Sequence, residues 1–344
     1  LDILKSVWKC LLDTENMFDF LYRNTNAEQR KDLVYALTLK RYKFNWANPT
    51  ASWSLNLEDK TQRAIMMQLV AINNFESEFS RNLSGRGDTS QQGNWFNFRN
   101  SKYTTNKETR ELLVDKDFVK NLPTSGTIEF DYVSTTRPVL TGETTTRLIT
   151  DDEMFAFNER LGLSSRKKVS NASSLFMLMD LQLASAAYYF TVENVHTLLD
   201  SFEEHWELQA RVIVCMFSRI VDLHRMDILL RHLTRKTQQE VIRRIGCLNL
   251  VNPLKCSFDY VLCLKHLDNR ILLIALMELA SMESADQIIE DPTTELPIAT
   301  IYGAYTRTLN ESRPETMRFL FTDFGKRTKT VNWTARKELI KKFL

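Results

Sequence analysis

The spacing of apolar residues along the chain predicts mostly helices, joined by a few short strands. Val195, Leu198, Leu199 and Phe202 recur at helical spacing and form one face behind Thr191, a residue type that caps helix N-termini. Further helices are expected at about 151–161, 173–190 and 206–221. Strict alternation of apolar and polar residues predicts strands in "ASWSLNL" (51–57), "TIEFDYV" (127–133) and "SFDYVLCL" (257–264).

The hydrophobic pattern also repeats along the chain. "LLDTENMFDFLYRNT" (11–25) matches "IVDLHRMDILLRHLT" (220–234), and after compensating gaps residues 54–77 match 261–284. The pattern predicts a duplicated helix–strand–helix unit of about 65 residues, because compensated gaps with a shared ending are hard to obtain by chance. In each copy an aspartate, Asp13 or Asp222, is expected to accept hydrogen bonds from the free N–H groups of the helix that follows it.

Together these patterns predict a mainly α fold with minor β, in which two duplicated helix–strand–helix units flank a mixed α/β insertion. We expect four segments along the chain: repeat unit 1 at 1–78, a polar loop and small mixed insertion at 79–170, a helical module with repeat unit 2 at 171–285, and a C-terminal extension at 286–344. The first copy opens inside its second helix, so we expect the chain to belong to a longer polypeptide.

Composition narrows the functional class only slightly. The hydrophobic share of 43% and charged share of 26% are those of a globular protein, and a net charge of +2 provides no overall field for nucleic acid or an acidic membrane. The five cysteines have no disulfide-framework spacing, and the most apolar run (173–190) is interrupted by Asp180 and Gln182. We therefore expect a cytoplasmic protein with no membrane span and no cofactor.

One stretch resembles a known family. Phe190-Thr191, Val195, Leu198-Leu199 and Phe202, followed by Ile220-Val221-Asp222, resemble a helical domain family of unknown function that usually reads F-T-x-x-Q-V-x-x-L-L-x-x-F. The likeness covers residues 185–235, and this chain has Asn194 where that family usually has glutamine. The resemblance implies a helical packing unit and brings no catalytic residues.

Within the polar, largely aperiodic stretch 79–125, the aromatic residues Trp95, Phe96 and Phe98 lie close together in the sequence. They either hold the loop on its own domain or dock a partner, since aromatic anchors dominate interface energetics. Both readings remain open, and we count these three residues as candidate partner contacts.

A short basic segment, "SSRKKVS" (164–170), supplies three further candidate partner contacts: Arg166, Lys167 and Lys168. A solvated linker is the simpler reading of such a charge run. Ser165 or Ser170 in this segment would be available for phosphorylation.

Two groups of residues with catalytic or metal-binding side chains are set aside. Cys247, Cys256, Cys263 and His266 have the ligand types for zinc but lack the short C-x2-C spacing that strong zinc motifs have. "FEEHWE" (202–207) places carboxylates beside His205, but a helix points these side chains in different directions. We therefore predict neither a metal site nor a catalytic site.

The expected function is non-enzymatic: a protein–protein interaction or scaffold subunit of a large assembly, with a cytoskeletal or ciliary setting preferred. Stacked repeats present broad surfaces that suit this role. The first alternative is a hydrolase-like enzyme whose site would bring Glu204, His205 and His224 together. The second is a nucleic-acid-binding protein that would use the basic stretches 166–168 and 326–342.

Overall fold

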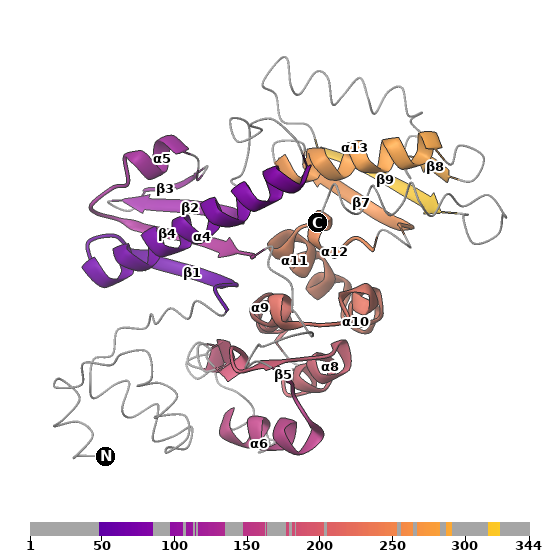
Figure 1. The fold of residues 1–344 in the computed structure, drawn as a ribbon, viewed down its shortest axis with the longest axis horizontal. Helices are drawn as coiled ribbons and strands as arrows, with labels where there is room; N and C mark the ends of the chain where they lie inside the picture. Colours follow the sequence, from indigo (N-terminus) through magenta and orange to yellow (C-terminus); the bar gives the residue numbers. More distant parts are fainter. Residues whose placement is uncertain are drawn as a thin grey trace. The chain divides into compact units, whose positions relative to one another are not determined.

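The chain forms a mixed α/β fold in the computed structural model (Figure 1). The model describes residues 48–84, 97–105, 108–112, 114, 116–134, 147–161, 163, 177–178, 181–182, 184–202, 205–252, 256–263, 267–282, 287–290 and 316–323. About 56% of these residues are helical and 23% lie in strands. The strands are β1 (Ala51–Asn56), β2 (Phe98–Thr105), β3 (Glu108–Glu111), β4 (Thr127–Tyr132), β5 (Arg147–Leu148), β6 (Tyr188–Tyr189), β7 (Phe258–Cys263), β8 (Gln287–Glu290) and β9 (Thr316–Asp323).

The α-helices are α4 (Lys60–Ser84), α5 (Lys116–Lys120), α6 (Asp151–Leu161), α8 (Val192–Asp200), α9 (Trp206–Met216), α10 (Met226–His232), α11 (Arg235–Ile245), α12 (Cys247–Leu250) and α13 (Leu267–Met282). Two 3-10 helices, η2 (Phe217–Arg219) and η3 (Leu223–Arg225), separate α9 from α10. The strands form a four-stranded sheet in the order β1-β4-β2-β3, a parallel pair β5-β6, and an antiparallel sheet in the order β7-β9-β8.

The prediction of a mainly α fold with minor β is wrong. The stretch expected to be an irregular loop contains β2 and β3, and the expected C-terminal extension contains β8 and β9. The alternation was missed in β2 because buried positions there carry polar side chains: Arg99 is 5% and Ser101 8% exposed. By contrast, β1, β4 and β7 confirm the three predicted strands, and α6 and α8 confirm two predicted helices.

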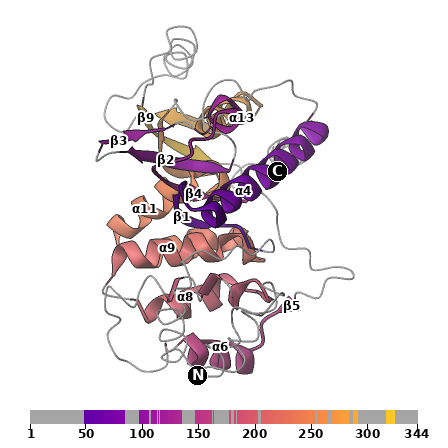
Figure 2. The same ribbon diagram turned by 90° about the vertical axis from the view of Figure 1, so that its left-hand side faces the viewer.

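The chain divides into two compact units, one of residues 1–67 with 132–241 and the other of residues 68–131 with 242–344. In the first unit, α9 lies between β1 and α8, and α6, α8 and α9 are stacked in that order (Figures 1 and 2). Burial of α9 is nearly complete, since Ala210, Val212, Ile213, Val214 and Met216 are all 0% exposed. The apolar core of this unit is therefore organised around α9.

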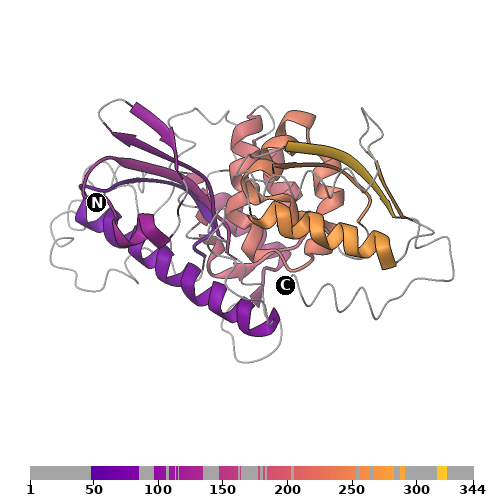
Figure 3. The same cartoon turned by 90° about the horizontal axis from the view of Figure 1, so that it is seen from above.

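The second unit contains the three-stranded sheet, with α13 lying along one of its faces (Figure 3). Tyr260 and Phe319 face each other across β7 and β9 with their rings stacked 5.5 Å apart. Leu272, Leu276 and Leu279 recur at helical spacing on α13 and are each 2% exposed. This apolar face of the helix closes the core.

The strand and helix of the two predicted repeats begin at equivalent positions. β1 and β7 start 207 positions apart (51 and 258), and so do α4 and α13 (60 and 267). The next strands also correspond: β2 and β8 start 189 positions apart (98 and 287), and so do β4 and β9 (127 and 316). The helical part of the first repeat falls in 1–47, outside the described residues, so the duplication of the complete unit stays a prediction.

A buried ion pair in the second unit joins β4 to α11. The guanidinium of Arg244 donates to Asp131 at 2.9 Å, and these side chains are 9% and 3% exposed. Asn100, held at a φ of 52°, donates to the other oxygen of Asp131 at 2.8 Å and to the carbonyl of Arg243 at 2.9 Å. Asparagine tolerates this left-handed backbone conformation better than most residues. The Asp131 carboxylate therefore accepts a charged and a neutral hydrogen bond in a desolvated site.

We expect Asp131→Ala to destabilise the protein by about 3–5 kcal/mol, because it leaves the Arg244 charge buried without its carboxylate. The matched control is Asp227→Ala, which removes the exposed pair with Arg231 (33% and 69% exposed) and is expected to cost about 1 kcal/mol or less. Urea unfolding followed by circular dichroism measures both free energies. Equal losses in the two variants would contradict a special role for the buried pair.

Candidate functional site

The structure places one of the six candidate partner contacts. Phe98 lies in β2, is 1% exposed, and packs its ring 5.1 Å from that of Phe130. Of the two readings of the aromatic residues, this position corresponds to attachment of the segment to its own domain. Trp95, Phe96, Arg166, Lys167 and Lys168 lie outside the described residues, as do Ser165 and Ser170.

The residues set aside as zinc ligands are not brought together as a site in the described parts of the chain. Cys247 and Cys256 are buried in the apolar cluster around Tyr260 and Leu262, and Cys263 is half-buried. His266 lies outside the described residues, and within those residues no three His, Cys, Asp or Glu side chains are grouped as a metal would require. The two cysteines therefore serve as small apolar core residues.

The histidines considered for acid–base chemistry belong to separate local structures. His205 immediately precedes α9, and its backbone N–H donates to the carbonyl of Phe202 at 2.9 Å. His224 lies in η3, beyond the end of α9, and Glu204 is outside the described residues.

No helix in the part of the chain that the structure describes is both long and apolar enough to cross a bilayer.

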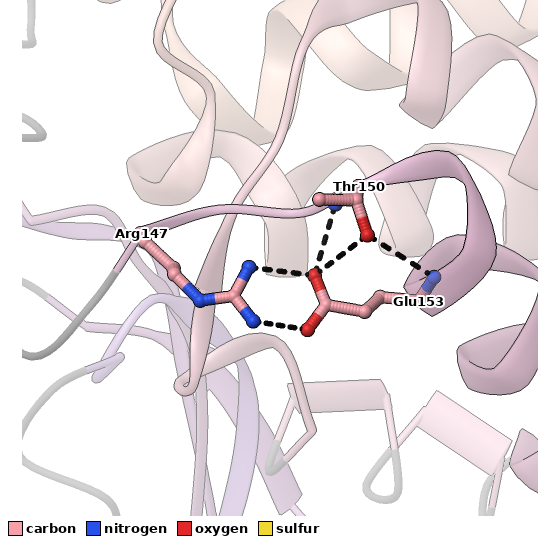
Figure 4. Close-up of polar contacts among 3 residues, drawn as sticks. All are labelled: Arg147, Thr150 and Glu153. Carbon is pink, nitrogen blue, oxygen red and sulfur yellow. Dashed lines mark hydrogen bonds and ion pairs between the residues drawn. The ribbon is translucent and has the colours of Figure 1, made fainter.

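At the start of α6, Arg147, Thr150 and Glu153 form one hydrogen-bonded network (Figure 4). The backbone N–H and hydroxyl of Thr150 each donate to Glu153 at 3.0 Å, and the N–H of Glu153 points back to that hydroxyl at 3.4 Å. This is the reciprocal arrangement of a capping box, which satisfies N–H groups that a helix start leaves without partners. Both guanidinium nitrogens of Arg147 donate to the Glu153 carboxylate, one of them at 2.7 Å.

These contacts set the charge state of the network. Hydrogen bonds from Arg147 and from the Thr150 N–H lower the pKa of Glu153 to about 2, and the same carboxylate raises the pKa of Arg147. The paired groups lie at the surface, where solvent limits the energy of an ion pair. Their main effect is therefore local: they fix where α6 begins and the direction in which it leaves β5.

α6 is anchored along one face and exposed along the other. Met154, Phe157 and Leu161 are 7%, 4% and 3% exposed, and the ring of Phe157 lies 5.4 Å from that of Phe190. Phe155, one position out of phase with this buried stripe, is 68% exposed. A phenylalanine so exposed on a firmly packed helix is the main feature of this surface.

Acidic side chains surround Phe155 on the outer face of α6. Asp151 and Asp152 lie one turn before it, Glu159 lies one turn after it, and all three are exposed. Leu148 in β5 adds a second apolar side chain, 42% exposed, next to the helix start. We call Leu148, Asp151, Asp152, Phe155 and Glu159 the α6 face.

The α6 face was not among the residues predicted to contact partners. The sequence signals that could have found it are the capping box T-x-x-E at 150–153 and a phenylalanine that falls between the buried positions 154 and 157. The sequence predicts the helix at 151–161, but the pattern alone does not show that Phe155 lies outside the buried stripe.

No model of a known protein family, no curated protein and no solved structure matches this chain.

Replacing Glu153 by glutamine tests the charge part of the network, because glutamine retains the acceptor of the capping box but not the ion pair. The pKa of Glu153 lies below its ordinary value of 4.5 in the folded protein, so its charge adds stability above about pH 4.5. That contribution is lost as the pH falls towards 2.

We therefore expect the wild type to be more stable than Glu153→Gln at pH 7 and the difference to disappear near pH 2. Urea unfolding of both proteins across this range measures it, and carboxylates common to the two proteins cancel in the comparison. A stability difference that does not change with pH would show that the ion pair contributes nothing.

Proposed function

We propose that this protein acts by binding other proteins, as a non-enzymatic interaction or scaffold subunit, and that the α6 face is one of its docking surfaces. The observation that carries the proposal is the 68% exposure of Phe155 on a helix whose opposite side is packed into the first unit. Aromatic side chains at the centre of an interface are the ones that most often dominate its binding energy.

The energetics of the α6 face suit reversible binding. Transferring an exposed phenylalanine into an apolar pocket contributes about 1.5–3 kcal/mol, or about tenfold to a hundredfold in affinity. The capping network and the buried stripe hold the helix in place before a partner arrives, so little further ordering is required on binding.

The charges of the α6 face favour a partner with complementary chemistry. Asp151, Asp152 and Glu159 give the surroundings of Phe155 a negative potential. The partner that fits is a protein with an apolar pocket bordered by lysine or arginine residues. Opposite charges of this kind raise the rate of association more than the final affinity, and salt weakens the effect.

The test is affinity capture of the tagged full-length protein from its own cells, with quantitative mass spectrometry of the bound proteins. Phe155→Ala is expected to reduce capture of at least one stoichiometric partner by about tenfold or more, since the anchor side chain is removed. The matched control is Ile228→Ala, which truncates another exposed apolar side chain (41%) of the same unit, on α10.

Recovery of the same partners at the same level with all three proteins would contradict docking through the α6 face. Capture that depends on Phe155 and declines as salt rises from 50 to 300 mM would support both its aromatic and its acidic components, in keeping with a screening length of about 10 Å at 0.1 M salt.

A further inference from the structure

The outer side of α4 has an apolar row where an exposed helix face is usually polar. Ala64, Met67, Ala71 and Phe75 recur at spacings of three and four residues, and all four are exposed. Met67 is 47% and Phe75 72% exposed. The opposite side of the helix is the buried one.

The buried side of α4 accounts for packing within the chain. It consists of Ile65, Met66, Leu69 and Val70, which are between 0% and 4% exposed. The outer row is therefore a second apolar surface on the same helix, and the core already formed does not explain it. We call Lys60, Ala64, Met67, Ala71 and Phe75 the α4 row.

We infer that the α4 row binds the α4 row of a second copy of this chain, with the two helices antiparallel. This deepens the proposed interaction function, on which it rests, by naming one partner. It uses a different helix from the α6 face, so the two surfaces are tested independently.

The order of large and small residues makes the row complementary to itself in the antiparallel direction. A two-fold axis at the level of residue 69 sets Met67 opposite Ala71 of the second copy, and Phe75 close to its Ala64. Each large side chain then meets a small one, and the alanines allow the helix axes to approach to about 8–10 Å. Because the axis repeats every contact, both pairs occur twice.

A parallel arrangement lacks this complementarity. It would set Met67 against Met67 and Phe75 against Phe75, with the alanines leaving gaps between them. It would also set Lys60, which is exposed, against Lys60 of the other copy. Both the volumes and the charges therefore favour the antiparallel direction.

The helix dipoles also favour the antiparallel direction, because the dipoles of the two helices are then opposed.

The size of the contact sets the expected strength. The row extends over about 23 Å, at a rise of 1.5 Å for each residue from 60 to 75. A single helix pair of this length buries less than the roughly 1,600 Å² of a standard interface, so we expect a reversible dimer with a Kd on the order of 10 μM.

Sedimentation equilibrium of the purified full chain from 1 to 200 μM tests the inference. The wild type is expected to convert from monomer to dimer across this range, and Phe75→Glu to remain monomeric because its carboxylate would lie in the apolar contact. Phe155→Ala is the matched control and is expected to dimerise as the wild type does. Circular dichroism checks that each variant is folded, which the 72% exposure of Phe75 favours.

A size exchange tests the direction of the helices. Ala71→Met is expected to weaken the dimer by about threefold to tenfold, because it sets two methionines opposite one another at both equivalent contacts. The double variant Met67→Ala/Ala71→Met restores one large and one small residue at each contact and is expected to regain the wild-type affinity. A single variant without effect, or a double variant that is not rescued, would overturn the antiparallel pairing.

A wild type that remains monomeric at 200 μM would overturn the inference as a whole. That result would leave the proposed function intact wherever capture of other proteins still depends on Phe155. Conversely, a dimer that depends on Phe75, without any Phe155-dependent partner, would retain this inference and refute docking through the α6 face.

Discussion

The burial of the C-terminal part of α9, residues 212–216, is the constraint on which the first unit depends. A buried helix end cannot satisfy its last backbone carbonyls with water, so other parts of the chain must supply the donors. Asn48 does this: its amide donates to the carbonyl of Cys215 at 3.0 Å and to the hydroxyl of Ser185 at 2.9 Å. It accepts in turn from Ser218 at 2.9 Å. One buried asparagine thus joins the residues before β1 to the C-terminal end of α9 and to Ser185.

The same constraint explains two charged side chains just beyond α9. Burial lowers the pKa of Arg219, whose guanidinium donates to the carbonyls of Ser185, Ala186 and Tyr188 at 2.8–3.3 Å and lies 4.5 Å from the centre of the Tyr189 ring. Carbonyl groups at the end of a helical segment and the face of an aromatic ring both stabilise a cation away from water.

Asp222 is a hydrogen-bond acceptor, whereas Arg219 is a donor. Its carboxylate accepts at 2.7 Å from the N–H of Val192, the first residue of α8, and makes no capping bond to the helix that follows it. The expectation that Asp222 caps its own helix was therefore wrong, although a free helix N–H group is its partner. Phe190 and Ile220 pair between these segments, and Phe157 of α6 packs on Phe190. Through these contacts the position of Phe155 on the outer face follows from the burial of α9.

Local signals in the sequence were sufficient for the cap of α8, where the partner lies within a few positions. Thr191 was expected to cap a helix, and it does so within a capping box completed by Asn194. That asparagine stands where the resembling family usually has glutamine, and it supplies the side-chain oxygen that the box requires. The alternating strands were found for the same reason, because an alternating pattern is visible without knowledge of the partner strand.

Contacts between residues distant in the chain could not be predicted from the sequence. Asn97 donates to Glu76 at 2.6 Å across 21 positions, and Asn100 reaches Arg243 across 143. Buried polar residues such as Asn97, just before β2, and Arg99, within it, look like an irregular loop until their surroundings are known, which is why β2 was missed. The exposure of Phe155 and Phe75 could not be predicted either, because a helical pattern shows which residues share a face but not which face is buried.

Two segments of the chain have corresponding elements: β1, α4, β2 and β4 in one, and β7, α13, β8 and β9 in the other. Comparing them shows which positions the fold constrains and which it leaves free. In both sheets the last strand lies between the first strand and the strand that follows the helix, and "TIEFDY" of β4 corresponds to "TMRFLF" of β9. Phe130 and Phe319, at the same place in these strands, are 3% and 1% exposed, so the inward position requires an aromatic residue in both.

The outer sides of α4 and α13 differ in their residues. Where α4 has exposed Ala64 and Met67, α13 has half-buried Ile271 and Ile274. Inward positions are fixed by close packing against a sheet, whereas outward positions are free to diverge until something binds them. A row that alternates large and small residues on α4 alone is therefore better explained by a contact of that helix than by the fold that both segments share.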